Sequence, residues 1–103
     1  MDTVYVITNP LFPNYIKIGH TNCLYTRLKK LSTSVPMAYK VILAVKVKNA
    51  KKVEHLLHSQ YRDCYMLNPK TFSKEWYPTE NVFFDNVEEF VKDIKDSIEK
   101  FKK

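Results

Sequence analysis

The chain has 103 residues, of which 45% are hydrophobic and 27% are charged, and this composition excludes a disordered or collagen-like chain and favours one domain. The 17 Lys and Arg against 11 Asp and Glu give a net charge of +6, which favours a polyanionic partner such as nucleic acid. Gly19 is the only glycine, so the glycine-rich phosphate loops of P-loop and dinucleotide-binding enzymes are excluded. The lysines also suit a plain solvated surface, and the charge alone leaves both interpretations open.

The cysteine pattern and the apolar stretches indicate the cell compartment. Cys23 and Cys64 lack metal-ligand spacing, and no secretory leader or glycosylation sequon is present. No apolar stretch approaches the roughly 20 residues that span a bilayer. We therefore expect a soluble protein with reduced thiols and no membrane partner. Its expected location is intracellular, in the cytoplasm of a bacterial or virus-infected cell, with the nucleus as an alternative.

Two strands are predicted at the start of the chain. Residues 3–7 and 15–19 are rich in β-branched and aromatic side chains, and the proline-rich segment 9–14 between them suits an antiparallel connection. Side chains alternate between the two faces of a strand, so a suitable register places Tyr5 and Lys17 on a common face.

Two helices and a third strand follow. The first helix carries an apolar stripe, with Thr21 or Asn22 as its cap and Pro36 at its end. A strand is predicted over 41–47 and a second helix over 50–63, where Glu54 and His58 lie one turn apart at the edge of the stripe. The two stripes consist of Leu24, Leu28, Leu31 and Val35, and of Val53, Leu56, Leu57 and Tyr61.

The last third of the chain predicts short extended pieces at 75–77 and 82–84 and then a strongly periodic helix. Asn86 and Glu89 stand in the spacing of a helix-capping box before that helix. The chain as a whole predicts a small mixed α/β (α+β) domain with a central antiparallel sheet flanked by helices, in the order β-β-α-β-α, short extended segments and a C-terminal helix. We expect one domain over 1–103, in which 86–103 forms a packing helix.

Five short motifs follow one another along the chain: Val4-Tyr5-Val6, Ile16-Lys17-Ile18-Gly19-His20-Thr21, Arg27, Glu54-x-x-Leu57-His58 and Glu75-Trp76-Tyr77. In this order they resemble the GIY-YIG nuclease superfamily. The likeness is strongest to a phage and viral subfamily of DNA-binding domains with a short K-I-G-x-T signature, and it covers residues 3–84. We expect a GIY-YIG-like domain from this resemblance.

The resemblance implies a metal-dependent endonuclease that hydrolyses DNA and leaves a 5′-phosphate and a 3′-hydroxyl. Tyr5 would orient or deprotonate the attacking water, and Arg27 would hold the scissile phosphate with its planar guanidinium. Lys17 stands where the superfamily usually has tyrosine, which shifts its role toward electrostatic stabilisation, and His20 adds a further basic group. Glu54 would bind one Mg²⁺ or Mn²⁺.

Three more positions belong to the same expected site in secondary or substrate-contact roles. These positions are Gly19, His58 and Glu75. Gly19 at the end of a strand suits a positive φ or a close backbone approach. A zinc site is disfavoured because His55, His58 and Glu54 do not follow the H-E-x-x-H order.

Other interpretations of these residues remain open. Tyr5 is also a good strand former and Glu54 an ordinary solvated helix residue. The alternative to an endonuclease is a catalytically inactive nucleic-acid-binding module of the same fold, and a protein-interaction domain has lower weight. DNA is the expected partner, with RNA and a homodimer as further options.

Overall fold

The computed structural model describes residues 2–33, 36–62, 76–80 and 83–102. These residues form one four-stranded antiparallel sheet, in the strand order β3-β1-β2-β4, and three helices. The elements in chain order are β1 (Asp2–Thr8), β2 (Tyr15–Thr21), α1 (Leu24–Ser32), β3 (Lys40–Val47), α2 (Ala50–Gln60), β4 (Trp76–Pro78) and α3 (Val87–Phe101). The predicted α+β class and element order are confirmed.

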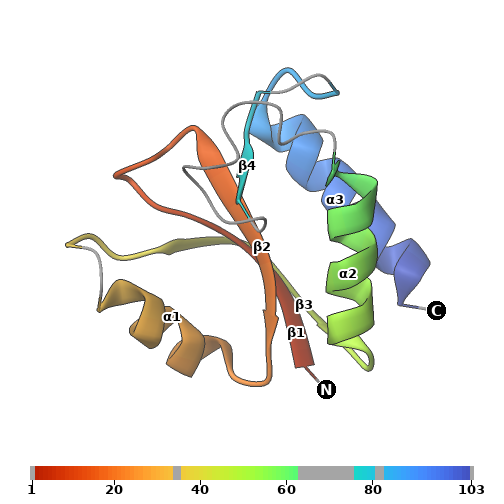
Figure 1. Cartoon of the computed structure of the whole chain (residues 1–103), viewed down its shortest axis with the longest axis horizontal. Coiled ribbons are helices and arrows are strands. Elements are labelled where there is room, and N and C mark those ends of the chain that lie inside the picture. The colour runs from red at the N-terminus through yellow and green to blue at the C-terminus, as the bar shows by residue number, and fades with distance from the viewer. Residues whose placement is uncertain (1, 34–35, 63–75, 81–82, 103) are drawn as a thin grey trace.

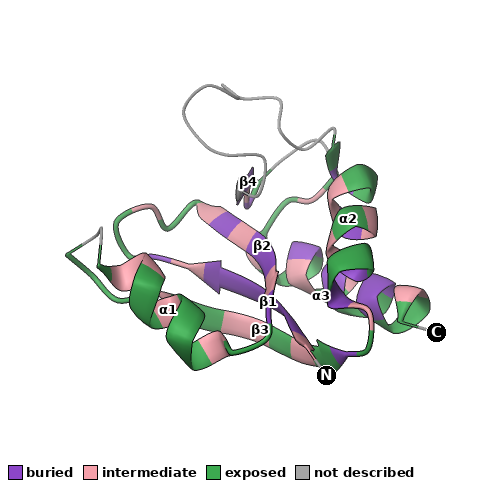
Figure 2. Cartoon of the chain, turned by 60° about the horizontal axis from the view of Figure 1, so that its bottom comes forward, coloured by how far each residue is buried: buried purple, intermediate pink, exposed green. Residues whose placement is uncertain are grey.

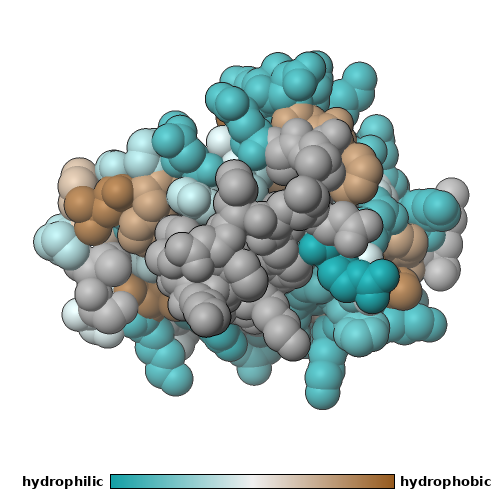
Figure 3. Space-filling view, turned by 45° about the horizontal axis from the view of Figure 1, so that its top comes forward, coloured by the Kyte–Doolittle hydropathy of each residue, from teal (hydrophilic) through white to brown (hydrophobic). Residues whose placement is uncertain are grey.

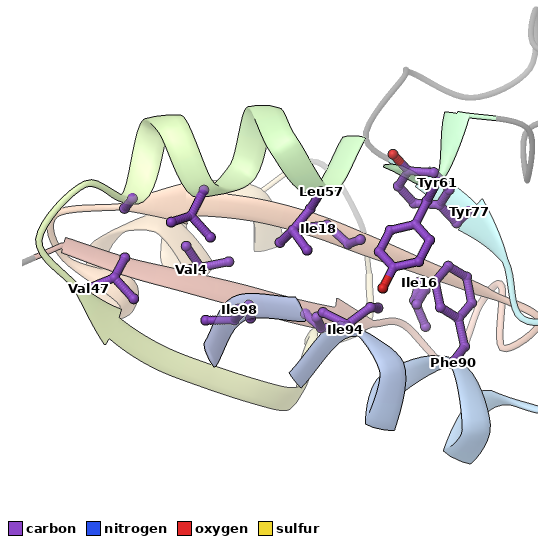
Figure 4. Packing of buried hydrophobic residues seen from close by; sticks show 13 residues of the cluster. Val4, Ile16, Ile18, Val47, Leu57, Tyr61, Tyr77, Phe90, Ile94 and Ile98 are labelled. Atoms are coloured by element: carbon purple, nitrogen blue, oxygen red, sulfur yellow. The ribbon is translucent and has the colours of Figure 1, made fainter. Parts of the chain in front are cut away.

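The helices lie on both sides of the sheet. Figure 1 shows α1 on one side and α2 with α3 on the other. The main core fills the space between the sheet and the α2–α3 side, where Val4 and Ile18 from the strands meet Leu57 and Ile94 from the helices, all 0% exposed (Figure 4). Burial of these aliphatic side chains is the main favourable contribution to folding, and it fixes α2 against β1 and β2.

The α1 side of the sheet is covered more loosely. No residue of α1 is buried, and Figure 2 shows the helix in the colours of exposed and intermediate residues only. The strand residues beneath are nevertheless buried, since Tyr5 is 1% and Ile7 0% exposed. Leu24 and Leu28 of the predicted apolar stripe lie on the less exposed side of α1, but they are half-buried and not fully buried.

A polar clasp joins α2 to α3 at the end of α2. The Tyr61 hydroxyl donates to Asp93 Oδ2 at 2.5 Å, and Gln60 Nε2 donates to Ser97 Oγ at 2.7 Å. Burial raises the pKa of Tyr61, and the bond to Asp93 raises it further. The phenol therefore stays protonated as a donor, and the clasp holds α2 in a fixed position relative to α3.

Several predicted boundaries differ from the structure. Helix α1 ends at Ser32, and Val35 lies outside the described residues. Its N-cap is Cys23, without a side-chain capping bond, whereas Thr21 Oγ1 accepts from the Cys23 N–H in a local turn. Such hydroxyl-to-backbone bonds compete with helix capping and move the helix start.

The later boundaries differ as well. Helix α2 ends at Gln60, short of the predicted residue 63. Phe83 and Phe84 belong to no strand, and Val82 lies outside the described residues. The predicted cap of α3 is confirmed, because the Asn86 side chain accepts from the Glu89 N–H at 2.9 Å.

Among the described residues on the face that Figure 3 presents, most are hydrophilic, and the hydrophobic ones form separate patches. No helix among the described residues has both the length and the apolar composition that a bilayer crossing needs.

Gly19 is explained by the packing of one aromatic ring. Tyr5 and Gly19 are cross-strand partners in the β1–β2 pair, and the Tyr5 ring lies over the glycine. A Cβ at position 19 would stand 2.5 Å from Tyr5 Cζ and would also collide with the Tyr5 hydroxyl. The predicted close approach is therefore confirmed, whereas no positive φ occurs at Gly19.

Gly19→Ala tests this packing. We expect the added methyl group to displace the buried Tyr5 ring and to lower the free energy of unfolding by about 1–3 kcal/mol. Urea denaturation measures this loss in the wild type and again in a Tyr5→Leu background, where the shorter side chain leaves room for the methyl. Equal losses in the two backgrounds would contradict the proposed packing of the ring on Gly19.

Candidate functional site

Helix α2 presents two polar side chains along one edge of its buried stripe. Val53 and Leu57 are 0% exposed and anchor the helix to the core. Glu54 and His58 each follow one of these anchors, so they lie one turn apart at the boundary between the core and the surface. The sequence spacing predicted this arrangement, and the structure confirms it.

Strand β2 brings His20 to the same place. Alternation puts His20 on the face of Ile16 and Ile18, which is the face that α2 covers. β4 pairs with residues 15–17 of β2 only, so in the described part of the chain no strand covers the outer edge beside His20. The His20 side chain is 32% exposed, and its Nδ1 contacts Glu54 Oε2.

The other oxygen of the same carboxylate faces the second histidine. His58 Nε2 lies 3.4 Å from Glu54 Oε1, and His58 Nδ1 lies 2.5 Å from the Tyr77 hydroxyl. The His58 and Tyr77 rings also stack, with centroids 5.6 Å apart and planes at 13°. A chain of polar contacts therefore runs from Tyr77 on β4 through His58 and Glu54 to His20 on β2.

The chemistry of the groups assigns the protons along this chain. An ionised carboxylate only accepts, so each imidazole donates an N–H to Glu54. In the neutral tautomers that make these bonds, His58 accepts the Tyr77 proton at Nδ1, and the Nε2 of His20 carries no proton. No described residue bonds to His20 Nε2, and the exposure of the ring leaves this lone pair open to solvent.

The ionisation of Glu54 depends on these partners. Burial raises the pKa of Glu54, because its side chain is only 12% exposed. Hydrogen bonds from His58 and His20, together with their positive charge when protonated, outweigh burial and hold the pKa below its ordinary value of 4.5. Glu54 is therefore a carboxylate at neutral pH.

A carboxylate that holds an imidazole by Nδ1 prepares it for acid–base chemistry. The bond fixes the orientation and the tautomer of the ring, and the negative charge stabilises the imidazolium that forms when Nε2 takes a proton. His20 can therefore act as a general base toward water at the edge of the sheet.

The remaining predicted site residues lie elsewhere. Tyr5, Lys17 and Gly19 share one face of the sheet, as predicted, but this is the face opposite His20 and Glu54. Arg27 is exposed on α1, on the same side as Tyr5. The structure does not place the four expected phosphate contacts, Tyr5, Lys17, His20 and Arg27, on one side of the sheet. Residues 17 and 20 are three positions apart on β2, so their side chains point to opposite faces. Glu75 lies outside the described residues.

The predicted metal ligand is already hydrogen-bonded at both of its oxygens. Each carboxylate oxygen of Glu54 faces an imidazole nitrogen, so a cation would have to share the carboxylate with these two contacts. In the described residues no group of three or more His, Cys, Asp and Glu is arranged to hold a metal ion. The bonds from the two imidazoles compete with a cation for the Glu54 carboxylate, and a Mg²⁺ or Mn²⁺ ion at Glu54 stays a prediction.

Sequence reasoning missed the role of Tyr77. The residue is 0% exposed, and its hydroxyl bonds His58. A buried tyrosine hydroxyl needs a partner, and that requirement was the available signal. The partner itself could not be found without knowing that β4 lies beside β2.

Glu54→Gln tests the charge state of this site. Because the folded-state pKa is lowered, the carboxylate stabilises the protein above pH 4.5 and this contribution is lost as the pH falls through the folded-state pKa. We expect the wild type to lose stability over this acid range and Glu54→Gln to lose less. Urea unfolding measured from about pH 6 to pH 2 checks this, with the exposed Glu88→Gln as the matched control. Parallel profiles for the wild type and Glu54→Gln would contradict it.

Comparison with known proteins corrects the family prediction. The T5orf172 domain model matches residues 2–101. No GIY-YIG model matches, so the assignment to the GIY-YIG superfamily is wrong. The motif misled because its parts have ordinary structural causes: Val4-Tyr5-Val6 is a typical strand sequence, and Gly19 is required under the Tyr5 ring.

The other comparisons add no relatives, since no curated protein and no solved structure matches the chain. The T5orf172 match is compatible with nucleic-acid binding or with endonuclease activity. It spans nearly the whole sequence, and the chain therefore belongs to the T5orf172 domain family.

Proposed function

We propose that this domain binds nucleic acid and hydrolyses its phosphodiester bonds, with His20 as the general base. The observation that carries the proposal is the Glu54 carboxylate, which holds His20 by Nδ1 and leaves Nε2 open at the edge of the sheet. The net charge of +6 favours a polyanionic substrate, and the family is compatible with such an activity.

The proposed step uses a water molecule beside His20. His20 Nε2 takes one proton as the water oxygen forms a bond to phosphorus, and the bond from phosphorus to the leaving oxygen breaks. The leaving oxygen takes a proton from solvent, and His20 returns its proton to solvent. Glu54 stabilises the intermediate imidazolium, while His58 and Tyr77 fix the other carboxylate oxygen and so keep the carboxylate plane in place.

The role of a divalent metal is left to experiment. Mg²⁺ or Mn²⁺ would supply charge neutralisation at the phosphate, which is the chemistry such ions provide in phosphoryl transfer. The proposed hydrolysis does not pass through the ion, since the carboxylate that was predicted to bind it is engaged by histidines. Cleavage is therefore measured with Mg²⁺, with Mn²⁺ and with EDTA.

His20→Ala tests the proposed base. We expect nicking of supercoiled plasmid to slow by about 100-fold or more, because a positioned base typically contributes 10²–10⁴-fold. Affinity for DNA should change little, since the variant keeps every lysine. Plasmid nicking and fluorescence anisotropy measure the two effects separately, and Glu88→Gln serves as a control with wild-type activity.

Two results would overturn parts of the proposal. Equal nicking rates for wild type and His20→Ala would remove His20 from the mechanism. If the wild type binds DNA but cleaves no plasmid, branched or single-stranded substrate under any metal condition, the proposed hydrolysis is contradicted and the proposed nucleic-acid binding is supported.

A further inference from the structure

One edge of the sheet offers a long stretch of backbone for pairing. In the strand order β3-β1-β2-β4, β3 and β4 are the two edges. β4 has three residues and ends in Pro78, so it is a poor template for another strand. β3 has eight residues, and in the described part of the chain only β1 pairs with it. The N–H and C=O groups on the outer side of β3 therefore face away from the sheet.

The side chains of this edge are mostly apolar although the edge is exposed. Six of the eight residues in KVILAVKV are apolar, yet only Val47 is buried. Figure 2 shows the strand in the colours of exposed and intermediate residues over most of its length. A long apolar edge of this kind is a template for pairing with another chain.

A groove opens beside the start of β3, between this strand and α3. Its volume is about 660 Å³, and apolar side chains from both elements line it without being buried. These side chains are Val41, Ile42, Val87 and Val91. Ile42 is the extra residue of a β-bulge at this end, so Leu43–Val47 stays regular for backbone pairing. An apolar side chain that enters the groove can therefore bury further surface.

The rim of the groove and the edge strand are basic. Three lysines and one glutamate line the groove, namely Lys40, Lys92, Lys95 and Glu88. Among the residues that the structure describes, none of these lysines forms an ion pair, although Glu88 precedes Lys92 by one helical turn. Lys46 adds a positive charge near the other end of β3. Charge complementarity therefore favours a partner that carries carboxylates at both ends of the paired stretch.

A second copy of this chain is a poor occupant of the same edge. Each copy carries a net charge of +6, and pairing β3 with β3 would bring two sets of lysines together. Like charges on facing strands are destabilising, and lysines on an edge strand commonly protect it from self-pairing. A nucleic acid supplies negative charge but has neither a peptide backbone for the ladder nor aliphatic side chains for the groove. An acidic segment of another protein has all three properties.

We infer that β3 binds an extended acidic segment of a partner protein, which adds a fifth strand to the sheet and places apolar side chains in the groove beside α3. Side chains of a strand alternate between its faces, so apolar residues at every second position all point to the groove side. Backbone bonds to β3 provide affinity, and the groove provides specificity. The flanking carboxylates lie beside the lysines at the two ends of β3. The inference is independent of the proposed hydrolysis.

Fluorescence anisotropy with a labelled nine-residue peptide tests strand addition. The peptide has two glutamates at each end of a core in which three valines alternate with two threonines. Its matched control carries N-methyl groups on all five core amides, which keeps the charges and side chains but removes the donors of the ladder. We expect the control to bind about tenfold more weakly or worse, because each lost hydrogen bond costs roughly 1 kcal/mol.

The double variant Lys92→Ala/Lys95→Ala tests the groove, and Lys51→Ala/Lys52→Ala on α2 is its control with the same reduction of charge. We expect the affinity for the peptide to fall about fivefold in the α3 variant, the loss expected for two exposed ion pairs. The α2 control should keep an affinity close to that of the wild type. Thermal melting of both variants checks that they are folded.

Amide resonances locate the bound peptide, and we expect shifts at residues 40–47 and 87–95. Equal affinities for the two peptides would overturn strand addition, and equal losses in the two double variants would overturn the groove. A wild type that does not bind the acidic peptide would overturn the whole inference. A dimer in sedimentation of the protein alone, with protected β3 amides, would assign the edge to a second copy. Shifts at residues 40–47 with an oligonucleotide but not with the peptide would assign it to nucleic acid, and both results contradict the inference.

Discussion

One carboxylate, Glu54, is the point on which the candidate site depends. It is largely buried, which opposes its charge, and two imidazoles offset that cost by donating to its two oxygens. His20 comes from β2 and His58 from α2, and Tyr77, which bonds His58, comes from β4. The charge of one side chain therefore couples three elements of the fold. A buried carboxylate with its partners removed would be destabilising, which makes the histidines part of the structure as well as of the proposed chemistry.

The two faces of the sheet differ in packing and in the groups they carry. On the α1 side, the Tyr5 ring packs across Gly19 and fills a loosely covered face. On the α2 side, buried aliphatic residues hold the helix in place, and the polar chain lies along the edge of that core. The Tyr61 clasp to α3 fixes the end of α2. The position of α2 therefore determines the orientation of His20.

Much of the fold could be predicted because local patterns and tertiary packing agree. Strand alternation and helical stripes gave the elements, and the spacing of Glu54 and His58 gave one side of the site. The face of His20 also follows from alternation, since residues 17 and 20 cannot point the same way on one strand. The bond from Tyr77 to His58 depended on a strand pairing between segments distant in sequence, which no local pattern shows. The short motifs did not identify the family, because some of their residues, such as Gly19 under the Tyr5 ring, are explained by packing alone.

The tautomer of His20 tests the central claim most directly. Nitrogen-15 NMR of the side chain distinguishes the protonated ring nitrogen from the unprotonated one, at a pH well above the ordinary imidazole pKa of roughly 6.5. We predict a proton on Nδ1, held by Glu54, and a free lone pair on Nε2, with a change in the Nδ1 signal in Glu54→Gln. A proton on Nε2 with Nδ1 unprotonated, unaffected by Glu54→Gln, would contradict both the site geometry and the role of His20 as a base.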